Sequence, residues 1–113
     1  MITAAFEREE GKYISLCVSG HAGQAEVGKD IVCSAASILM YTIAQTITQM
    51  NKQGWLKKKP RINLKDGKGT VTCVPKAEYY DECLMAFFVV EMGYVLLAKN
   101  YPQYVAINPF GEA

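Results

Sequence analysis

The sequence predicts an α+β domain in which two helices pack on an antiparallel sheet of two hairpins, in the order ββα-ββα. Short segments that alternate apolar and polar residues occur in two pairs, and each pair precedes a long segment with apolar residues at helical spacings. The chain has 113 residues, of which 50% are hydrophobic, so it can build one core. We therefore expect a single domain that spans residues 1–113.

The first hairpin is predicted over residues 2–18. Apolar residues alternate with other residues along 2–6 and again along 14–18, which is the period of a strand with one buried face. The polar segment Glu9-Glu10-Gly11-Lys12 between them predicts the turn.

A glycine-bearing loop and a long helix are expected next. Gly20, Gly23 and Gly28 interrupt residues 20–29, where no apolar period is present, so we expect a substrate loop whose backbone can approach a ligand closely. Asp30 predicts the N-cap of the helix that follows. That helix has an apolar stripe at helical spacings, made of Ile31, Val32, Ala35, Leu39, Ile43 and Ile47.

The second half of the chain repeats this layout. Residues 62–64 and 70–74 predict two strands joined by a turn at Asp66-Gly67. A second helix is expected over residues 78–100, and residues 104–107 allow a last short strand. This helix is apolar nearly all round, and one sheet can cover only one of its faces. We therefore expect a homodimer to cover the rest, the alternative being a core helix with a crowded surface.

Composition excludes several classes of protein. A formal net charge of +1 gives no overall attraction to nucleic acid or to an anionic membrane. Residues 1–10 lack the apolar run of a signal peptide, and the apolar stretch 85–98 is interrupted by Glu91 and is shorter than the roughly 20 residues of a membrane span. We expect a cytoplasmic protein with no membrane contact and no direct nucleic-acid binding.

The cysteines do not form a metal motif. The 4 cysteines are far apart, no CxxC pair occurs, and the chain has 1 histidine. These spacings do not predict a zinc site, and without a secretory signal they do not predict disulfides. No metal and no cofactor is expected.

Cys33 is the candidate nucleophile. With Asp30 as the N-cap, Cys33 lies in the first helical turn, where unpaired backbone N–H groups and the helix dipole stabilise a thiolate, the reactive form of cysteine. The glycine loop can bring His21 over the start of this helix. A Cys33–His21 pair would combine an activated nucleophile with a general base, and Asp30 or Ser37, on the same helical face as Cys33, could orient the imidazole.

Each of these residues also has a purely structural interpretation. A lone cysteine in a helix is usually a small core residue, and a lone histidine in a loop is usually solvated. Asp30 needs no function beyond capping, and Ser37 can bond back to the preceding turn. The residue types and spacings by themselves leave both interpretations open.

The order of this segment resembles the ribosomal-processing cysteine protease (Prp) family. That family has a Gly-His pair, a glycine-bearing loop, and a helix start of the Asp-Ile-Val-Cys type followed by small residues and a serine. In this chain the matching residues are Gly20-His21, Gly23, Gly28, Asp30-Ile31-Val32-Cys33, Ala35-Ala36 and Ser37. Both hairpins and the closing helix agree with the family's layout, so the resemblance covers essentially the whole chain. Gln24 departs from the aromatic or small residue expected there, which concerns fine substrate preference.

The resemblance implies a dimeric cytoplasmic protease. Such enzymes remove the N-terminal extension of a large-subunit ribosomal protein, cutting after an aromatic residue and before a small one. Cys33 would then be the nucleophile and His21 the base, with a thioester acyl-enzyme as intermediate. Gly20, Asp30 and Ser37 match the family's other motif positions.

Two other functions remain open. The basic run 57–59, with Arg61 and with Trp55 as a stacking residue, would suit a non-catalytic ribosome-associated binding protein, although such runs are usually solvated connections. Alternatively, Cys33 could be a redox-sensing thiol, which would need Cys17 or Cys73 near it in space as a resolving cysteine. Peptide cleavage without an oxidant separates these functions.

Overall fold

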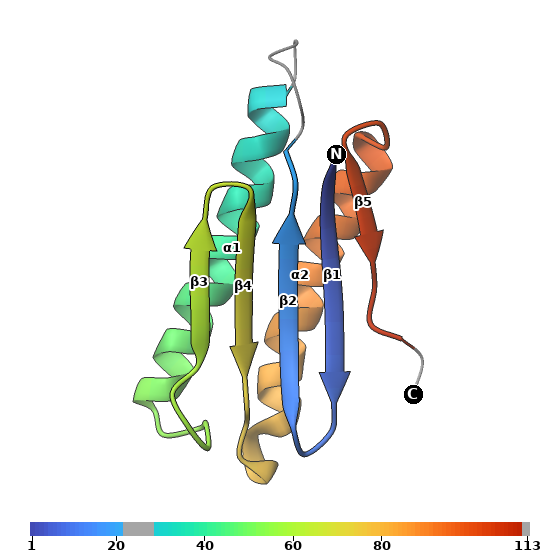
Figure 1. Cartoon of the computed structure of the whole chain (residues 1–113). Coiled ribbons are helices and arrows are strands. Elements are labelled where there is room, and N and C mark those ends of the chain that lie inside the picture. The colour runs from blue at the N-terminus through green and yellow to red at the C-terminus, as the bar shows by residue number, and fades with distance from the viewer. Residues whose placement is uncertain (22–28, 112–113) are drawn as a thin grey trace.

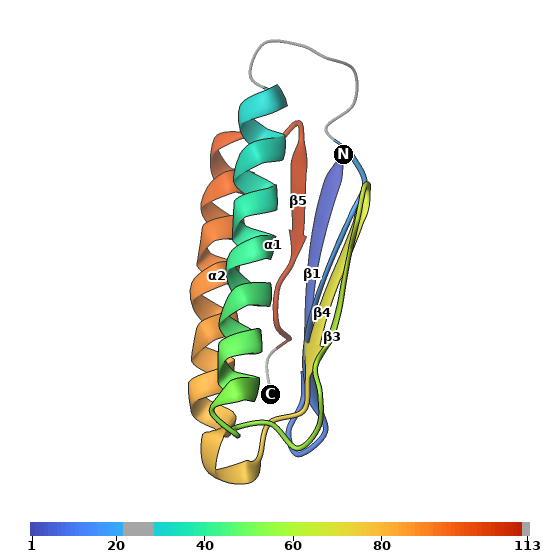
Figure 2. The ribbon, with the colours of Figure 1, turned by 90° about the vertical axis from the view of Figure 1, so that its left-hand side faces the viewer.

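The computed structural model describes residues 1–21 and 29–111, and it has two layers. One layer is a five-stranded sheet, and the other is a pair of helices that lie side by side on one face of it (Figures 1 and 2). The elements in chain order are β1 (Ile2–Glu9), β2 (Tyr13–Ser19), α1 (Lys29–Lys52), β3 (Arg61–Lys65), β4 (Lys68–Cys73), a short 3-10 turn (Ala77–Tyr79), α2 (Tyr80–Asn100) and β5 (Val105–Asn108). The expected α+β class, with two helices packed on a sheet, is confirmed.

The expectation of an antiparallel sheet is wrong, because the sheet is mixed. Its strand order is β3-β4-β2-β1-β5, and β5 pairs with β1 in parallel, with Ile2 opposite Val105. The pairs β1–β2, β2–β4 and β3–β4 are antiparallel. The parallel pair arises because α2 runs the full length of the sheet after β4, so the chain enters β5 at the end where β1 also begins (Figure 1).

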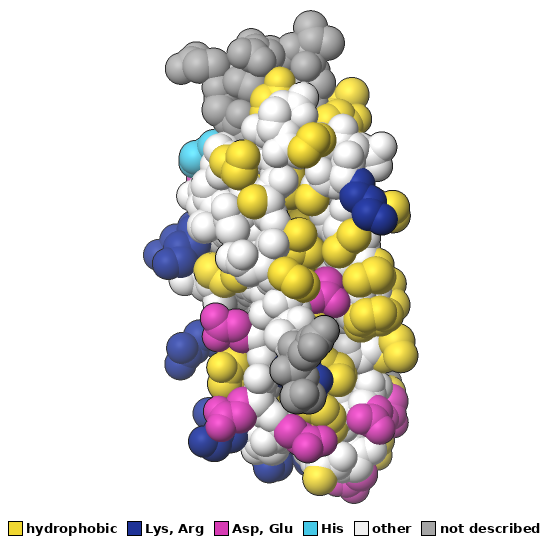
Figure 3. All heavy atoms as spheres, turned by 90° about the vertical axis from the view of Figure 1, so that its right-hand side faces the viewer, with side chains coloured by type: hydrophobic (Ala, Val, Ile, Leu, Met, Phe, Trp, Pro, Cys, Tyr) yellow, Lys and Arg dark blue, Asp and Glu magenta, His cyan; other side chains and the backbone are white. Residues whose placement is uncertain are grey.

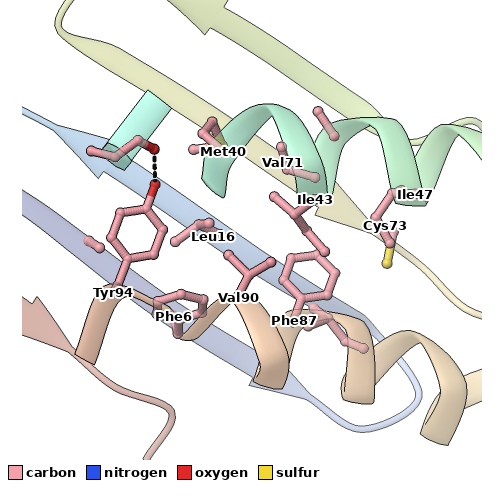
Figure 4. Packing of buried hydrophobic residues seen from close by; sticks show 14 of the residues in the cluster. Phe6, Leu16, Met40, Ile43, Ile47, Val71, Cys73, Phe87, Val90 and Tyr94 are labelled. Atoms are coloured by element: carbon pink, nitrogen blue, oxygen red, sulfur yellow. Dashed lines mark hydrogen bonds between the residues drawn. The ribbon is translucent and has the colours of Figure 1, made fainter. Parts of the chain in front are cut away.

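The hydrophobic core fills the space between the sheet and the helices. Leu16 and Val71 project from neighbouring strands toward Ile43 of α1 and Phe87 of α2, and all four are fully buried (Figure 4). Each strand therefore buries only one of its two alternating rows of side chains. Both helices of the described residues lie on the same face of the sheet, so the opposite face is not covered by a helix there (Figure 2).

The two helices approach each other closely at Gly93 of α2. A β-carbon on Gly93 would lie 2.5 Å from a methyl carbon of Leu39, so glycine is needed for this packing. Away from the sheet, apolar side chains of both helices remain exposed, namely Ile31, Ile38, Met85, Phe88, Val89, Met92 and Leu96. Figure 3 shows hydrophobic side chains gathered along this helical side of the molecule.

By length and composition, α1 could cross a membrane. Its segment Ile31–Lys52 has a hydropathy of 1.5. In this fold the helix lies along the sheet, and Ile43 and Ile47 are fully buried in the core. A core helix passes the same test of length and hydropathy, so this feature is weak support for a membrane span.

Candidate active site

His21 follows directly after a tight turn at the end of β2. Gly20 has a φ of +93°, and a β-carbon there would collide with the carbonyl oxygen of Met1. Two backbone hydrogen bonds hold this turn: the N–H of Gly20 donates to the carbonyl of Gly67 at 2.9 Å, and the nitrogen of Met1 donates to the carbonyl of His21 at 2.6 Å. The sequence therefore needs glycine before the histidine for a steric reason as well as for its backbone conformation.

Cys33 is presented by the N-terminal part of α1. Its neighbour Val32 is fully buried and anchors this part of the helix in the core, whereas Cys33 and Ser37 are exposed. The helix begins at Lys29, so Asp30 is a residue of the first helical turn and the prediction that it is the N-cap is wrong. The helix thus starts two residues before Ile31, where an Asp30 N-cap would have started it.

The cysteine and the histidine line one cleft. It has a volume of about 340 Å³ and lies between the N-terminal half of α1 and the ends of β2, β3 and β4. Of the predicted site residues, Gly20, His21, Cys33 and Ser37 line it together. The backbone of Asp30 is in α1, but its side chain lies outside what the structure describes, and so do Gly23 and Gly28.

The walls of the cleft have an apolar part and a polar part. Met40 extends from α1 to the strand β4, where a β-carbon on Gly69 would lie 3.0 Å from its terminal methyl. The other apolar lining residues are Ile2, Val18, Ala36, Tyr41 and Leu64, and the turn between β3 and β4 adds Lys65, Asp66, Gly67 and Lys68 at the mouth. The local sequence did not predict this turn as part of the site. The Asp66-Gly67 pair signals only a turn, and nothing local indicates that this turn lies beside His21.

The other cysteines lie away from the cleft. Cys73 is buried with Cys83, and donating a hydrogen bond to the thiol of Cys83, together with burial, raises the pKa of Cys73. The sulfur of Cys17 is 3.8 Å from the hydroxyl of Thr70, which donates to it. Neither Cys17 nor Cys73 lines the cleft with Cys33. The redox-sensor alternative therefore lacks its resolving cysteine at this site.

The basic run lies at the opposite end of α1. Lys57, Lys58 and Lys59 are exposed in the connection from α1 to β3. The indole of Trp55 is stacked on the ring of Tyr79, with 4.9 Å between ring centroids and 6° between ring planes. One face of Trp55 is thus already covered within the chain, which weakens its proposed use as a stacking platform for bases.

Comparison with known proteins identifies the family to which the chain belongs. The profile of a family described as "Cysteine protease Prp" matches residues 1–106. The chain belongs to the cysteine protease Prp family. Among curated proteins, the Ribosomal processing cysteine protease Prp of Staphylococcus aureus is 34% identical over 100 residues, which cover 88% of this chain and 90% of that protein. The Prp resemblance and the cysteine-protease class read from residues 20–37 are thereby confirmed.

Solved structures, two of them of a Prp protease, share the fold. A crystal structure of the protease Prp from S. aureus with a substrate peptide has a TM-score of 0.69 and 21% identity, over 98% of this chain and 100% of that one. Another, with a covalently linked product peptide, has a TM-score of 0.68 and 25% identity over the same shares. A protein from Streptococcus mutans, at 26% identity, has a TM-score of 0.67 over 98% of this chain and 96% of its own.

Proposed function

We propose that this chain is a cytoplasmic cysteine endopeptidase that removes the N-terminal extension of a large-subunit ribosomal protein, with Cys33 as nucleophile and His21 as proton-transfer partner. The observation that carries the proposal is that these two side chains, from different elements, line the same cleft. The name of the 34% identical relative, a ribosomal processing protease, supports the substrate class.

The reaction would proceed through a thioester. His21 takes the thiol proton of Cys33, and the thiolate attacks the carbonyl carbon of the scissile bond. The protonated imidazole then donates its proton to the leaving amine as the C–N bond breaks, which leaves an acyl group on sulfur. Water, deprotonated by His21, attacks the thioester and releases the carboxyl product. The S. aureus protease crystallised with a covalently linked product peptide supports such a covalent step.

The oxyanion would be held by backbone N–H groups at the start of α1. Because α1 begins at Lys29, the N–H of Cys33 lies where it pairs with the carbonyl of Lys29 inside the helix. The donors are therefore the unpaired N–H groups of the first turn rather than that of Cys33 itself. Ser37 is exposed in the same cleft, where it would contact a bound substrate.

The apolar walls of the cleft suit an aromatic side chain on the acyl side of the cut. Leu64 and Tyr41 face the cleft from the sheet and from α1, and Met40 forms part of the wall between them. These apolar side chains favour burial of an apolar side chain of the substrate on their part of the cleft. The small substrate residue that follows the scissile bond would lie toward the charged residues at the turn between β3 and β4, Lys65, Asp66 and Lys68.

A homodimer would cover the outer face of the helices. A groove between them is lined by Ala35, Ile38, Leu39, Gly93, Leu96, Leu97, Asn100 and Tyr101. Ile38 is 61% exposed and Leu96 60% exposed at its edges. An exposed apolar face of this kind favours a second copy as its occupant, since a two-fold interface buries the same patch on both subunits.

The test is cleavage of a peptide with a Phe-Phe-Ala junction, followed by mass spectrometry. We expect the parent protein and the matched control Cys17→Ala to cut after the second Phe, and Cys33→Ala to leave the peptide intact while keeping its circular dichroism spectrum. Cleavage by Cys33→Ala at the parent rate, or an intact peptide with all three proteins, would contradict the proposal.

A further inference from the structure

We propose that Gly67, in the turn between β3 and β4, is a positioning residue for His21. The proposal deepens the proposed function and rests on it, because the orientation of the imidazole matters to the reaction only if His21 transfers protons. It also names a residue that the sequence motif around Cys33 does not contain.

The imidazole of His21 lies against the bare α-carbon of Gly67. A β-carbon on Gly67 would lie 2.5 Å from Nε2 of His21, 3.0 Å from Cε1 and 3.5 Å from Cδ2. Real β-carbons essentially never approach another heavy atom within 3.0 Å. The Nε2 edge of the ring therefore occupies the space that any side chain at position 67 would need.

The same glycine holds the backbone beside the histidine. Its carbonyl accepts the hydrogen bond from the N–H of Gly20, and its φ of +77° lets the turn take this shape. The register between β2 and β4, with Ser19 opposite Lys68, explains why the two turns meet: the residue after β2 lies next to the residue before β4. Gly67 therefore contacts both the backbone just before His21, through its carbonyl, and the imidazole ring of His21, through its bare α-carbon.

The contact of the His21 ring with Gly67 is a packing contact. His21 is exposed, and its ring nitrogens have no hydrogen-bond partner among the described side chains and backbone of residues 1–21 and 31–111. In many acid–base sites a third polar group orients the histidine. Here the steric contact with Gly67 limits where the imidazole can lie, and we propose that this contact helps to keep the ring in the geometry needed for proton transfer.

The expected consequence of adding a methyl group is a loss of turnover. Gly67→Ala must push the imidazole away from its place in the cleft, and a displacement of about 1 Å can lower a catalysed rate by about 10²-fold. We expect kcat to fall by that order while KM changes little, because the apolar walls that bind the peptide are left in place.

The chain offers a matched control in the turn between β1 and β2. Gly11 has a φ of +81°, close to the +77° of Gly67, but a β-carbon there would have nothing within 4 Å. Gly11→Ala therefore introduces similar backbone strain without touching His21. Steady-state cleavage of the Phe-Phe-Ala peptide by both variants separates displacement of the ring from strain in a turn. Equal kcat values for the two variants would overturn the proposal.

NMR supplies a readout that does not depend on cleavage. The chain has 1 histidine, so imidazole signals report His21 alone. In the parent protein we expect nuclear Overhauser effects between the ring Hε1 and the α-protons of Gly67, and we expect the ring signals to shift in Gly67→Ala but not in Gly11→Ala. Absence of these effects in the parent would overturn the positioning contact, even if Gly67→Ala failed to fold. If the parent shows them but no protein cuts the peptide, the proposed function fails and the contact remains.

Discussion

The hydroxyl of Tyr94 donates a hydrogen bond of 2.7 Å to the backbone carbonyl of Ala36, across the interface between α2 and α1 (Figure 4). Tyr94 is fully buried, and its ring also packs edge-on against Phe6, with 6.0 Å between centroids. Ala36 lies on α1 between Cys33 and Ser37. The bond therefore ties the helical segment that presents the candidate nucleophile to the second helix and, through Phe6, to the sheet.

Removing this hydroxyl should destabilise the protein moderately. Tyr94→Phe keeps the ring and its contact with Phe6 but removes the donor, and a buried hydrogen bond contributes about 1 kcal/mol to the free energy of unfolding. We expect a loss of that size in urea unfolding followed by circular dichroism. Tyr79→Phe is the control, because Tyr79 is only partly buried at the far end of the molecule. Equal stabilities of parent and Tyr94→Phe would show that the bond contributes nothing.

The same residue predicts a loss of stability at high pH. Burial raises the pKa of Tyr94 above its ordinary value of 10.0, so the native state keeps this proton at a pH where the unfolded state loses it. The contribution of Tyr94 is therefore fully present below pH 10 and declines as pH rises further, by up to about 1.4 kcal/mol per pH unit. We expect the stability of the parent to fall more steeply than that of Tyr94→Phe between pH 9.5 and about 11. Parallel curves would contradict the prediction.

The wall of the cleft should determine selectivity for an aromatic residue. Leu64 is 39% exposed and lines the cleft, so Leu64→Ala removes apolar contact without opening the core. We expect kcat/KM for the Phe-Phe-Ala peptide to fall about tenfold, since losing part of one apolar contact changes binding by about 1–2 kcal/mol. Val89→Ala, on the outer face of α2, is the control and should cleave at the parent rate. A fall of the same size in both variants would point to a general loss of folded protein.

A charge on the helical face should dissociate the proposed homodimer. Leu96 lines the groove between the helices, so Leu96→Lys would bring two like charges to an apolar two-fold interface. We expect a dimer for the parent and a monomer for Leu96→Lys by sedimentation velocity. Met85→Lys is the control, because Met85 is similarly exposed on α2 but does not line the groove. A monomeric parent would contradict the dimer proposal.

His21→Ala should resemble Cys33→Ala in turnover but not in its chemistry with small electrophiles. Without His21 the thiol loses its proton acceptor, and general-base assistance contributes typically 10²–10⁴-fold. We expect peptide cleavage to fall by at least about 10²-fold, while mass spectrometry still detects slow alkylation of Cys33 by iodoacetamide. Cleavage close to the parent rate would remove His21 from the mechanism.

Local sequence patterns were enough to predict the elements and the candidate pair of reactive residues. Alternation along residues 2–6 and 14–18 and helical spacing along α1 follow from local backbone geometry, and the structure has strands and a helix at those places. The segment from Gly20 to Ser37 was sufficient for the family and for the class of enzyme. These features could be read from sequence because each depends on residues that are close together in the chain.

The way in which distant segments meet could not be predicted from local patterns. The parallel pairing of β5 with β1 depends on the path of α2, and the contact between His21 and Gly67 depends on the register of β2 with β4. The start of α1 at Lys29 differs from the start that the capping preference of Asp30 predicts. Packing between layers selects one arrangement from several that local patterns allow equally, so the cleft walls and the glycine beneath the imidazole became visible only in three dimensions.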